Sequence, residues 1–241
     1  YNTVGMHNIA MGFESLKANT TGNYNVSIGH QALLTNTTGV ANTAIGSTSL
    51  YLNTVGVNNV AVGKNALYTN TTGNSNVALG YQAMKANTVG YENVAVGHYA
   101  LLTNSTAKWN VAVGNEALRY NTIGTLNTAV GAYALTTNTT GNYNVAVGNA
   151  ALKLNTTGNN NIAVGQESLR ENTVGVDNVA VGRRALFVNT TGYSNSAVGH
   201  QALYGLTTGW GNTAIGALAM TATVTGRRNT AVGYHALRRL T

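Results

Sequence analysis

The chain has 241 residues, of which only 8% are charged, and it contains neither Cys nor Pro. The absence of Cys excludes a disulfide framework and a thiolate zinc site. No apolar run approaches the roughly 20 residues of a membrane span, so we expect no direct membrane insertion. The formal net charge of +7 is spread over many repeats. Nucleic-acid-binding proteins instead gather Lys and Arg on one face, so we expect no nucleic-acid partner.

The main feature of the sequence is a repeat of 17 residues. The segment NVAVGNAALKLNTTGNN, from Asn144 to Asn160, is followed directly by NIAVGQESLRENTVG, and in this register the chain is 14 units long without insertion or deletion. So strict a period is typical of a solenoid, in which each unit stacks on the next. Residues 1–241 are therefore expected to form a single continuous repeat array with no internal domain boundary. Because the chain begins at Tyr1 and ends at Thr241 partway through a unit, we expect it to be a fragment of a longer fibre.

In chain order, each unit passes through a turn, a short strand and a second turn. The Asn-Thr-Thr-Gly spacing places turn-forming residues at fixed points. The strand follows, as in Val145-Ala146-Val147, which is short, β-branched and bounded by Asn and Gly. Seventeen residues cannot easily hold two helices and their turns. The sequence therefore predicts an all-β fold, a parallel β-solenoid of 14 coils that stack about 4.8 Å apart.

Two positions of the unit never vary, and both are expected to be structural. The first is an Asn, whose stacked amides should hydrogen-bond along the array as a ladder and cap the turns. This column comprises Asn8, Asn25, Asn42, Asn59, Asn76, Asn93, Asn110, Asn127, Asn144, Asn161, Asn178, Asn195, Asn212 and Asn229. The second is a Gly, expected where the backbone is closed to other residues or where no Cβ fits. This column comprises Gly12, Gly29, Gly46, Gly63, Gly80, Gly97, Gly114, Gly131, Gly148, Gly165, Gly182, Gly199, Gly216 and Gly233.

A second Asn column and a second Gly column recur with few exceptions. Leu206 and Thr223 interrupt the Asn column, and Ala107 interrupts the Gly column. Asn19-Thr20-Thr21 and its equivalents also match the N-glycosylation pattern. The spacing arises from the turn, and a ladder Asn is poorly placed to carry a glycan, so these matches are interpreted as incidental.

The alternation of strand side chains predicts which positions face inward. The aliphatic column is expected to fill the coil, with the residues two positions earlier on the same face, and a Leu column is expected to close the core. The aliphatic column includes Met11, Ile28, Ile45, Val62 and Leu79, and the Leu column includes Leu16, Leu33 and Leu50. The residue between the two β-branched ones is Ala in 13 units and Ser27 in the other. We expect this small-residue stripe to face outward and to form an interface between chains.

The repeats resemble those in the head domains of trimeric autotransporter adhesins, and also arrays in phage tail-fibre-like proteins. The resemblance rests on Asn-Val-Ala-Val-Gly followed two residues later by Ala-Leu, and it covers the whole chain. It implies a left-handed parallel β-roll, a homotrimeric rod with three chains around a common axis, and a role in surface attachment. The localisation that follows is extracellular, on a cell-surface filament or a phage particle.

The residues suggest three hypotheses for the function. The leading hypothesis is a non-enzymatic structural fibre or adhesin shaft with multivalent surface attachment. Its expected partners are further copies of the same chain and surface glycans. The alternative is an ice-binding β-solenoid, suggested by the column Thr3, Thr20, Thr37 and Thr54. An enzyme is disfavoured because the six acidic residues are scattered and a convex corner is not a cleft. The histidines suggest no metal site, and no cofactor is expected.

One candidate binding patch lies near the C-terminal end of the sequence. It comprises Arg227, Arg228, Arg238 and Arg239. Two hypotheses remain open for this stretch. Either the array becomes irregular near a cap or a following domain, or the arginines form a basic collar that attracts acidic or phosphorylated surface glycans.

Overall fold

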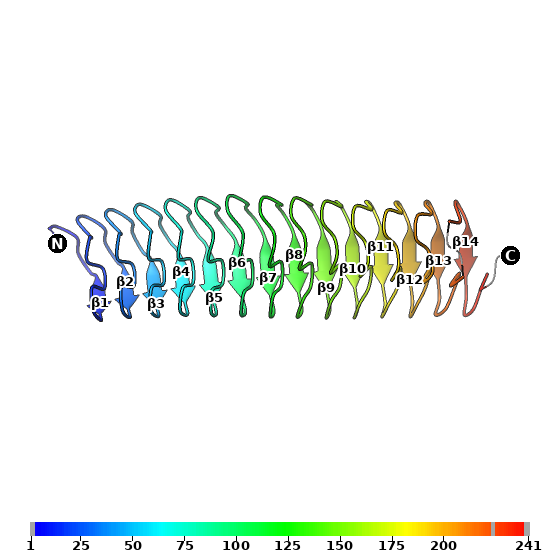
Figure 1. Ribbon diagram of the computed structural model, residues 1–241, viewed down its shortest axis with the longest axis horizontal. Coiled ribbons are helices and arrows are strands. Elements are labelled where there is room, and N and C mark those ends of the chain that lie inside the picture. The colour runs from blue at the N-terminus through cyan, green and yellow to red at the C-terminus, as the bar shows by residue number, and fades with distance from the viewer. Residues whose placement is uncertain (1–2, 223–224, 239–241) are drawn as a thin grey trace. The chain divides into compact units, whose positions relative to one another are not determined.

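The computed structural model describes residues 3–222 and 225–238. The chain divides into two compact units, Tyr1–Ile123 and Gly124–Thr241. From here on, a unit is one of these two parts of the chain, and a coil is one repeat of 17 residues. The described residues form β-strands and turns with no helix. Each unit is a stack of coils in which one coil contributes one three-residue strand, and neighbouring strands of a unit lie side by side (Figure 1). The prediction of an all-β, parallel β-solenoid with 17-residue coils is confirmed.

The strands recur at the spacing of the repeat. In the first unit they are β1 (Ile9–Met11), β2 (Val26–Ile28), β3 (Thr43–Ile45), β4 (Val60–Val62), β5 (Val77–Leu79), β6 (Val94–Val96) and β7 (Val111–Val113). In the second unit they are β8 (Thr128–Val130), β9 (Val145–Val147), β10 (Ile162–Val164), β11 (Val179–Val181), β12 (Ser196–Val198), β13 (Thr213–Ile215) and β14 (Thr230–Val232).

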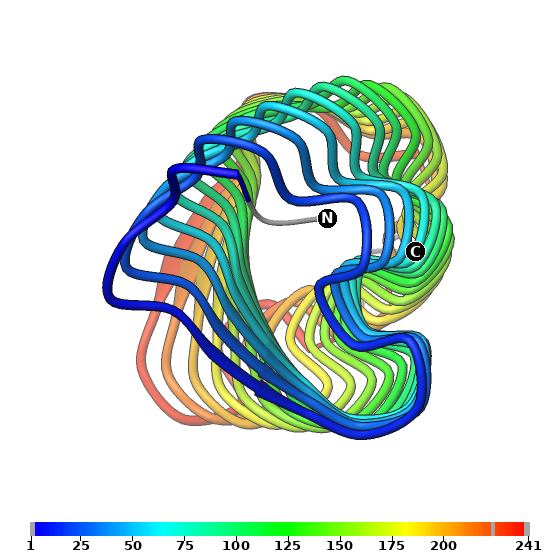
Figure 2. The ribbon, with the colours of Figure 1, turned by 90° about the vertical axis from the view of Figure 1, so that its left-hand side faces the viewer.

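Within each unit, every strand pairs in parallel with the next one at an offset of one repeat. For example, Val60 lies opposite Val77 in the first unit, and Ile162 lies opposite Val179 in the second. Backbone hydrogen bonds between coils continue outside the strands, as where the Thr20 N–H donates to the Thr37 carbonyl at 2.9 Å. Figure 2 shows the coils of the first unit, blue to green, following nearly the same path one behind another. This continuity satisfies backbone groups that short strands alone would leave unpaired.

The structure reverses the predicted faces of the strand. The middle residue points into the coil: Ala61 and Ala146 are completely buried. Its two neighbours point outward, so that Ile162 remains 40% exposed and Val164 37% exposed within a stack that continues on both sides of them. The expectation that the aliphatic column fills the interior, and that the Ala stripe is an outward interface, was therefore wrong.

The reason for the reversal is the narrowness of the coil. The alternation rule states that adjacent residues face opposite ways, but it does not say which face is inside. The interior of most coils already holds a Leu and two Asn side chains, such as Leu152, Asn144 and Asn155, all fully buried. Only a small side chain fits beside them, so the strand contributes an Ala, or Ser27 in one coil. The Leu column is in the core, as predicted.

The corners of the coil use left-handed backbone conformations at residues other than Gly. Leu152 has φ of 50°, Ala150 of 54° and Tyr143 of 58°, and equivalent residues in other coils are similar. Such conformations are uncommon and typically cost on the order of 1 kcal/mol or more each. Their amides are bonded to adjacent coils, as where the Leu152 N–H donates to the Ser168 carbonyl at 3.0 Å. Stacking therefore stabilises corners that an isolated coil would not hold.

Gly148 represents the invariant Gly column, and both of its predicted constraints apply. Its φ of +130° lies in a region that L-residues with a side chain rarely adopt. A Cβ built on it would lie 2.7 Å from the carbonyl oxygen of Gly165 in the following coil. Backbone conformation and the close approach of the next coil therefore both require glycine.

We predict that Gly148→Ala lowers the free energy of unfolding by more than about 1 kcal/mol, because it combines a strained φ with a backbone clash. Urea denaturation followed by circular dichroism would measure the loss. The matched control is Gly211→Ala, because a Cβ there meets only ordinary contacts, the nearest at 3.6 Å from Arg228 Cγ, at a φ of +67°. An equal loss in both variants would contradict this account of the invariant column.

Candidate functional site

The invariant Asn residues form a hydrogen-bonded ladder inside the coils. The Asn161 backbone N–H and its Nδ2 both donate to Asn144 Oδ1, at 3.0 and 3.2 Å. Asn161 Oδ1 in turn accepts from the backbone N–H and Nδ2 of Asn178, both at 3.1 Å. Each amide therefore acts as a link between two coils, and the side chains of this ladder are buried except near the ends of the array.

The second Asn column forms a parallel ladder that meets the first at a Gly carbonyl. Asn172 Nδ2 donates to Asn155 Oδ1 at 2.8 Å and to the Gly175 carbonyl at 3.1 Å. The same Gly175 carbonyl accepts from Asn161 Nδ2 at 2.8 Å. This junction was not foreseen from the sequence, although the second Gly column marks its position. Because Asn19, Asn155 and their equivalents are completely buried, the N-glycosylation matches fall on side chains that no glycan can reach.

Ala107, the exception in the second Gly column, coincides with a weaker ladder. Asn104 Nδ2 lies 3.3 Å from the Ala107 carbonyl. The bond from Asn121 Nδ2 to Asn104 Oδ1 is 3.2 Å, whereas the bond from Asn104 Nδ2 to Asn87 Oδ1 is 2.8 Å. A Cβ at the equivalent Gly56 would lie 2.6 Å from the Gly73 carbonyl oxygen. The extra methyl group therefore explains the longer bonds around this coil.

The Thr column of the ice-binding hypothesis is also engaged in stacking. Thr37 Oγ1 donates to the Thr54 carbonyl at 3.1 Å, and Thr156 Oγ1 donates to the Thr173 carbonyl at 3.0 Å. The next column, which is exposed, mixes Thr with aliphatic residues such as Val55 and Val174. The hydroxyl hydrogens of the Thr column therefore serve the solenoid itself.

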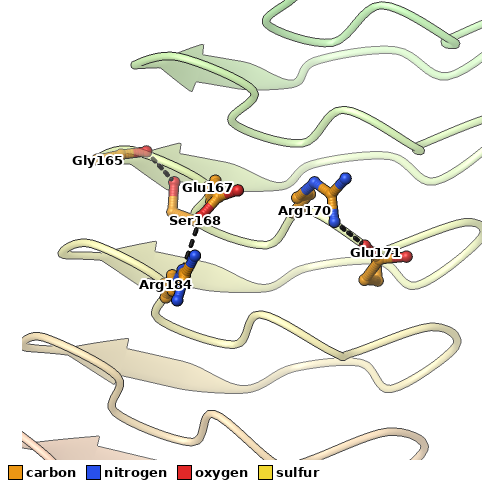
Figure 3. A network of polar contacts seen from close by, with 6 residues as sticks. All are labelled: Gly165, Glu167, Ser168, Arg170, Glu171 and Arg184. Carbon is orange, nitrogen blue, oxygen red and sulfur yellow. Dashed lines mark hydrogen bonds and ion pairs between the residues drawn. The ribbon is translucent and has the colours of Figure 1, made fainter.

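All six acidic side chains have polar partners. The pairs are Glu14–Lys17 at 2.6 Å, Glu92–Trp109 at 2.6 Å, Glu116–Arg119 at 2.9 Å, Glu167–Arg184 at 2.6 Å, Glu171–Arg170 at 2.5 Å and Asp177–Asn160 at 3.0 Å. Glu167 and Glu171, the closest acidic pair in sequence, turn to different arginines (Figure 3). The hydrogen bond from Arg184 lowers the pKa of Glu167 below its ordinary value, so this carboxyl is an ionised acceptor and not a proton donor near neutral pH.

The positive charge is concentrated toward the end of the sequence. Six of the 13 basic residues lie beyond Asp177, and none of the six acidic residues does. The other repeats carry one basic residue or none, and three Arg pairs are the exceptions. The six residues are Arg183, Arg184, Arg227, Arg228, Arg238 and Arg239.

The structure describes three of the four arginines of the candidate patch. Arg227 and Arg228 are exposed in the turn before β14, and Arg238 is exposed after the turn that follows it. Arg239 lies outside the described residues. The guanidinium of Arg228 lies 4.5 Å from the ring centre of Trp210, and the Trp210 ring stacks on Tyr193 at 5.6 Å with an interplanar angle of 5°. This aromatic–arginine cluster was not predicted from the sequence.

The described residues contain no group of three His, Cys, Asp or Glu side chains that could hold a metal ion. They also contain no helix that is long and apolar enough to cross a membrane.

We predict that Asn161→Ala lowers the free energy of unfolding by about 2 kcal/mol or more, since it leaves the buried Asn178 N–H without its acceptor.

Asn161→Asp should be less stable at pH 7 than at pH 4. Burial raises the pKa of the new carboxyl above its unfolded value, so stability is lost as the pH rises through the folded pKa. Denaturation curves at the two pH values would test this. Asn149→Ala, at an exposed position, is the control and should change little.

Comparison with protein-family models gives no match, and comparison with curated proteins gives no significant match. Function is therefore inferred from the fold, from the outward face of the strands and from the exposed side chains of the turns.

Proposed function

We propose that the chain is a structural, non-enzymatic segment of an extracellular fibre, built from several copies that associate through the outward aliphatic face of the strands. The observation that carries the proposal is this face itself. In each unit, two outward positions per coil present mostly Val and Ile, and no other described part of the same chain covers them fully. Contiguous exposed apolar surface of this kind is typical of protein–protein interfaces.

The composition of the two outward columns supports self-association. The column at the end of each strand is aliphatic in every coil, as at Val147, Val164 and Ile215. The column at the start of each strand is polar at Thr43, Thr128, Ser196, Thr213 and Thr230. A solvated strand face would not keep one position aliphatic fourteen times. A second copy with the same repeat would match this stripe coil by coil.

The resemblance to adhesin heads and phage tail-fibre-like arrays favours three chains around one axis, on a cell-surface filament or a phage particle. In such an assembly the solenoid sets distance and stiffness. The variable turns then carry the contacts with the target surface, for which we propose surface glycans. Because each turn is repeated in every copy, weak single contacts add up to useful avidity.

We predict that the double variant Val147→Lys/Val164→Lys weakens self-association at least a hundredfold, because it buries two charges in an apolar interface. Sedimentation equilibrium of the folded protein would measure the mass. Val174→Lys, which changes an exposed Val outside the strands, should leave the oligomer intact. A folded wild-type monomer, or an unchanged oligomer in the double variant, would refute the proposed interface.

A further inference from the structure

The turns before β12, β13 and β14 bring together Tyr193, Trp210 and Arg228 from three successive coils. The two rings are nearly parallel, and the guanidinium of Arg228 lies over the indole from the following coil. Trp210 is therefore covered on one face by Tyr193 and on the other by Arg228. Tyr193 is 42% exposed. What the cluster offers to solvent is the edge of the stack.

This edge is rich in hydrogen-bond donors that the described residues leave available. No described side chain accepts a hydrogen bond from the Trp210 indole N–H or from the Tyr193 hydroxyl. No carboxylate among the described residues lies within ion-pair distance of Arg228. Among the described residues, the cluster therefore combines a cation that has no carboxylate partner with two polar donors that have no acceptor.

Gly211 places no side chain beside the indole. At the equivalent positions of the neighbouring coils, Ser194 and Arg228 carry side chains and have φ of 54° in both cases. Gly211 has φ of +67°, and a Cβ there would meet its nearest neighbour, Arg228 Cγ, at an ordinary 3.6 Å. The position would accept a side chain, so the glycine is not required by the fold.

The first unit contains the same turns with a different outcome. Six repeats earlier, Tyr91 is equivalent to Tyr193 and Lys108 to Trp210. Glu92 is equivalent to Ser194 and Trp109 to Gly211. There the Trp109 indole N–H donates to Glu92 Oε2 at 2.6 Å, and Lys108 lies 4.3 Å from the Trp109 ring centre. In this turn a carboxylate accepts the indole donor. The chain therefore offers its own matched control.

We propose that Tyr193, Trp210, Gly211 and Arg228 form a subsite for an acidic saccharide, a sugar unit that carries a carboxylate, sulfate or phosphate group. Arg228 binds the anionic group through its forked donors. The indole N–H and the phenol bind sugar hydroxyls, and Gly211 contributes no side chain that would hinder the sugar ring. Nucleobases would need a free aromatic face, and both faces of Trp210 are covered. The subsite rests on the proposed function, since it names the glycan class that the turns of the fibre bind.

The test measures binding of the assembled protein to immobilised heparin, alginate and neutral dextran, with oligothymidylate as a nucleic-acid probe. We expect binding to heparin or alginate, weakening as salt is raised, and none to dextran. Arg228→Gln, Trp210→Asn and Gly211→Asn should each reduce that binding at least tenfold. The two Asn variants suit the fold because Asn142 and Asn160 occupy equivalent positions. Trp109→Asn should bind like the wild type.

Three results would overturn the subsite. The first is the absence of binding to both acidic polysaccharides, and the second is unchanged binding in the three variants. The third is that oligothymidylate binds as tightly as the acidic polysaccharides and that, of the three variants, only Arg228→Gln reduces this binding. The last result would indicate charge attraction without saccharide recognition. The mass of each sample, measured in parallel, separates this proposal from the proposed assembly. An intact oligomer with unchanged binding rejects the subsite alone, whereas a monomeric wild type rejects the assembly.

Discussion

The structure depends on the hydrogen bonding of amides that are buried inside the coils. Most coils enclose two Asn side chains, and a buried amide without partners costs roughly 1–3 kcal/mol. The partners come from the neighbouring coils, through the two Asn ladders and the Gly carbonyl that joins them. One inserted residue would displace both amides from their acceptors. The unbroken period of 17 residues is the consequence of this constraint.

The same constraint explains why the large aliphatic residues lie outside. Two Asn and one Leu fill a typical coil, so the strand can place only a small side chain inward, and its β-branched residues face away from the interior. A single chain therefore buries little apolar surface for its length. This is the physical basis for the proposed self-association, because a second copy can cover the stripe that the coil itself cannot enclose.

The repeated backbone also leaves the turns free to vary. The turn of Tyr91, Glu92, Lys108 and Trp109 and the turn of Tyr193, Ser194, Trp210 and Gly211 share one register. In the first, a carboxylate takes the indole donor. In the second, Ser194 stands where the first has Glu92, and Arg228 of the next coil lies over the indole of Trp210. Two surfaces with different charge thus arise on one scaffold without any change in the coil path.

The sequence by itself determined the period, the parallel solenoid and the positions of the strands, because these follow from spacing and turn chemistry that repeat in every unit. It also indicated the roles of the invariant Asn and Gly columns. It did not determine which strand face points inward, since alternation is symmetric and the size of the interior depends on Leu152, Asn144 and Asn155 meeting in space. Nor did it reveal the contact of Arg228 with Trp210. These residues lie 18 positions apart in the sequence, on successive coils, and only the stacking of coils at strand spacing brings their side chains together.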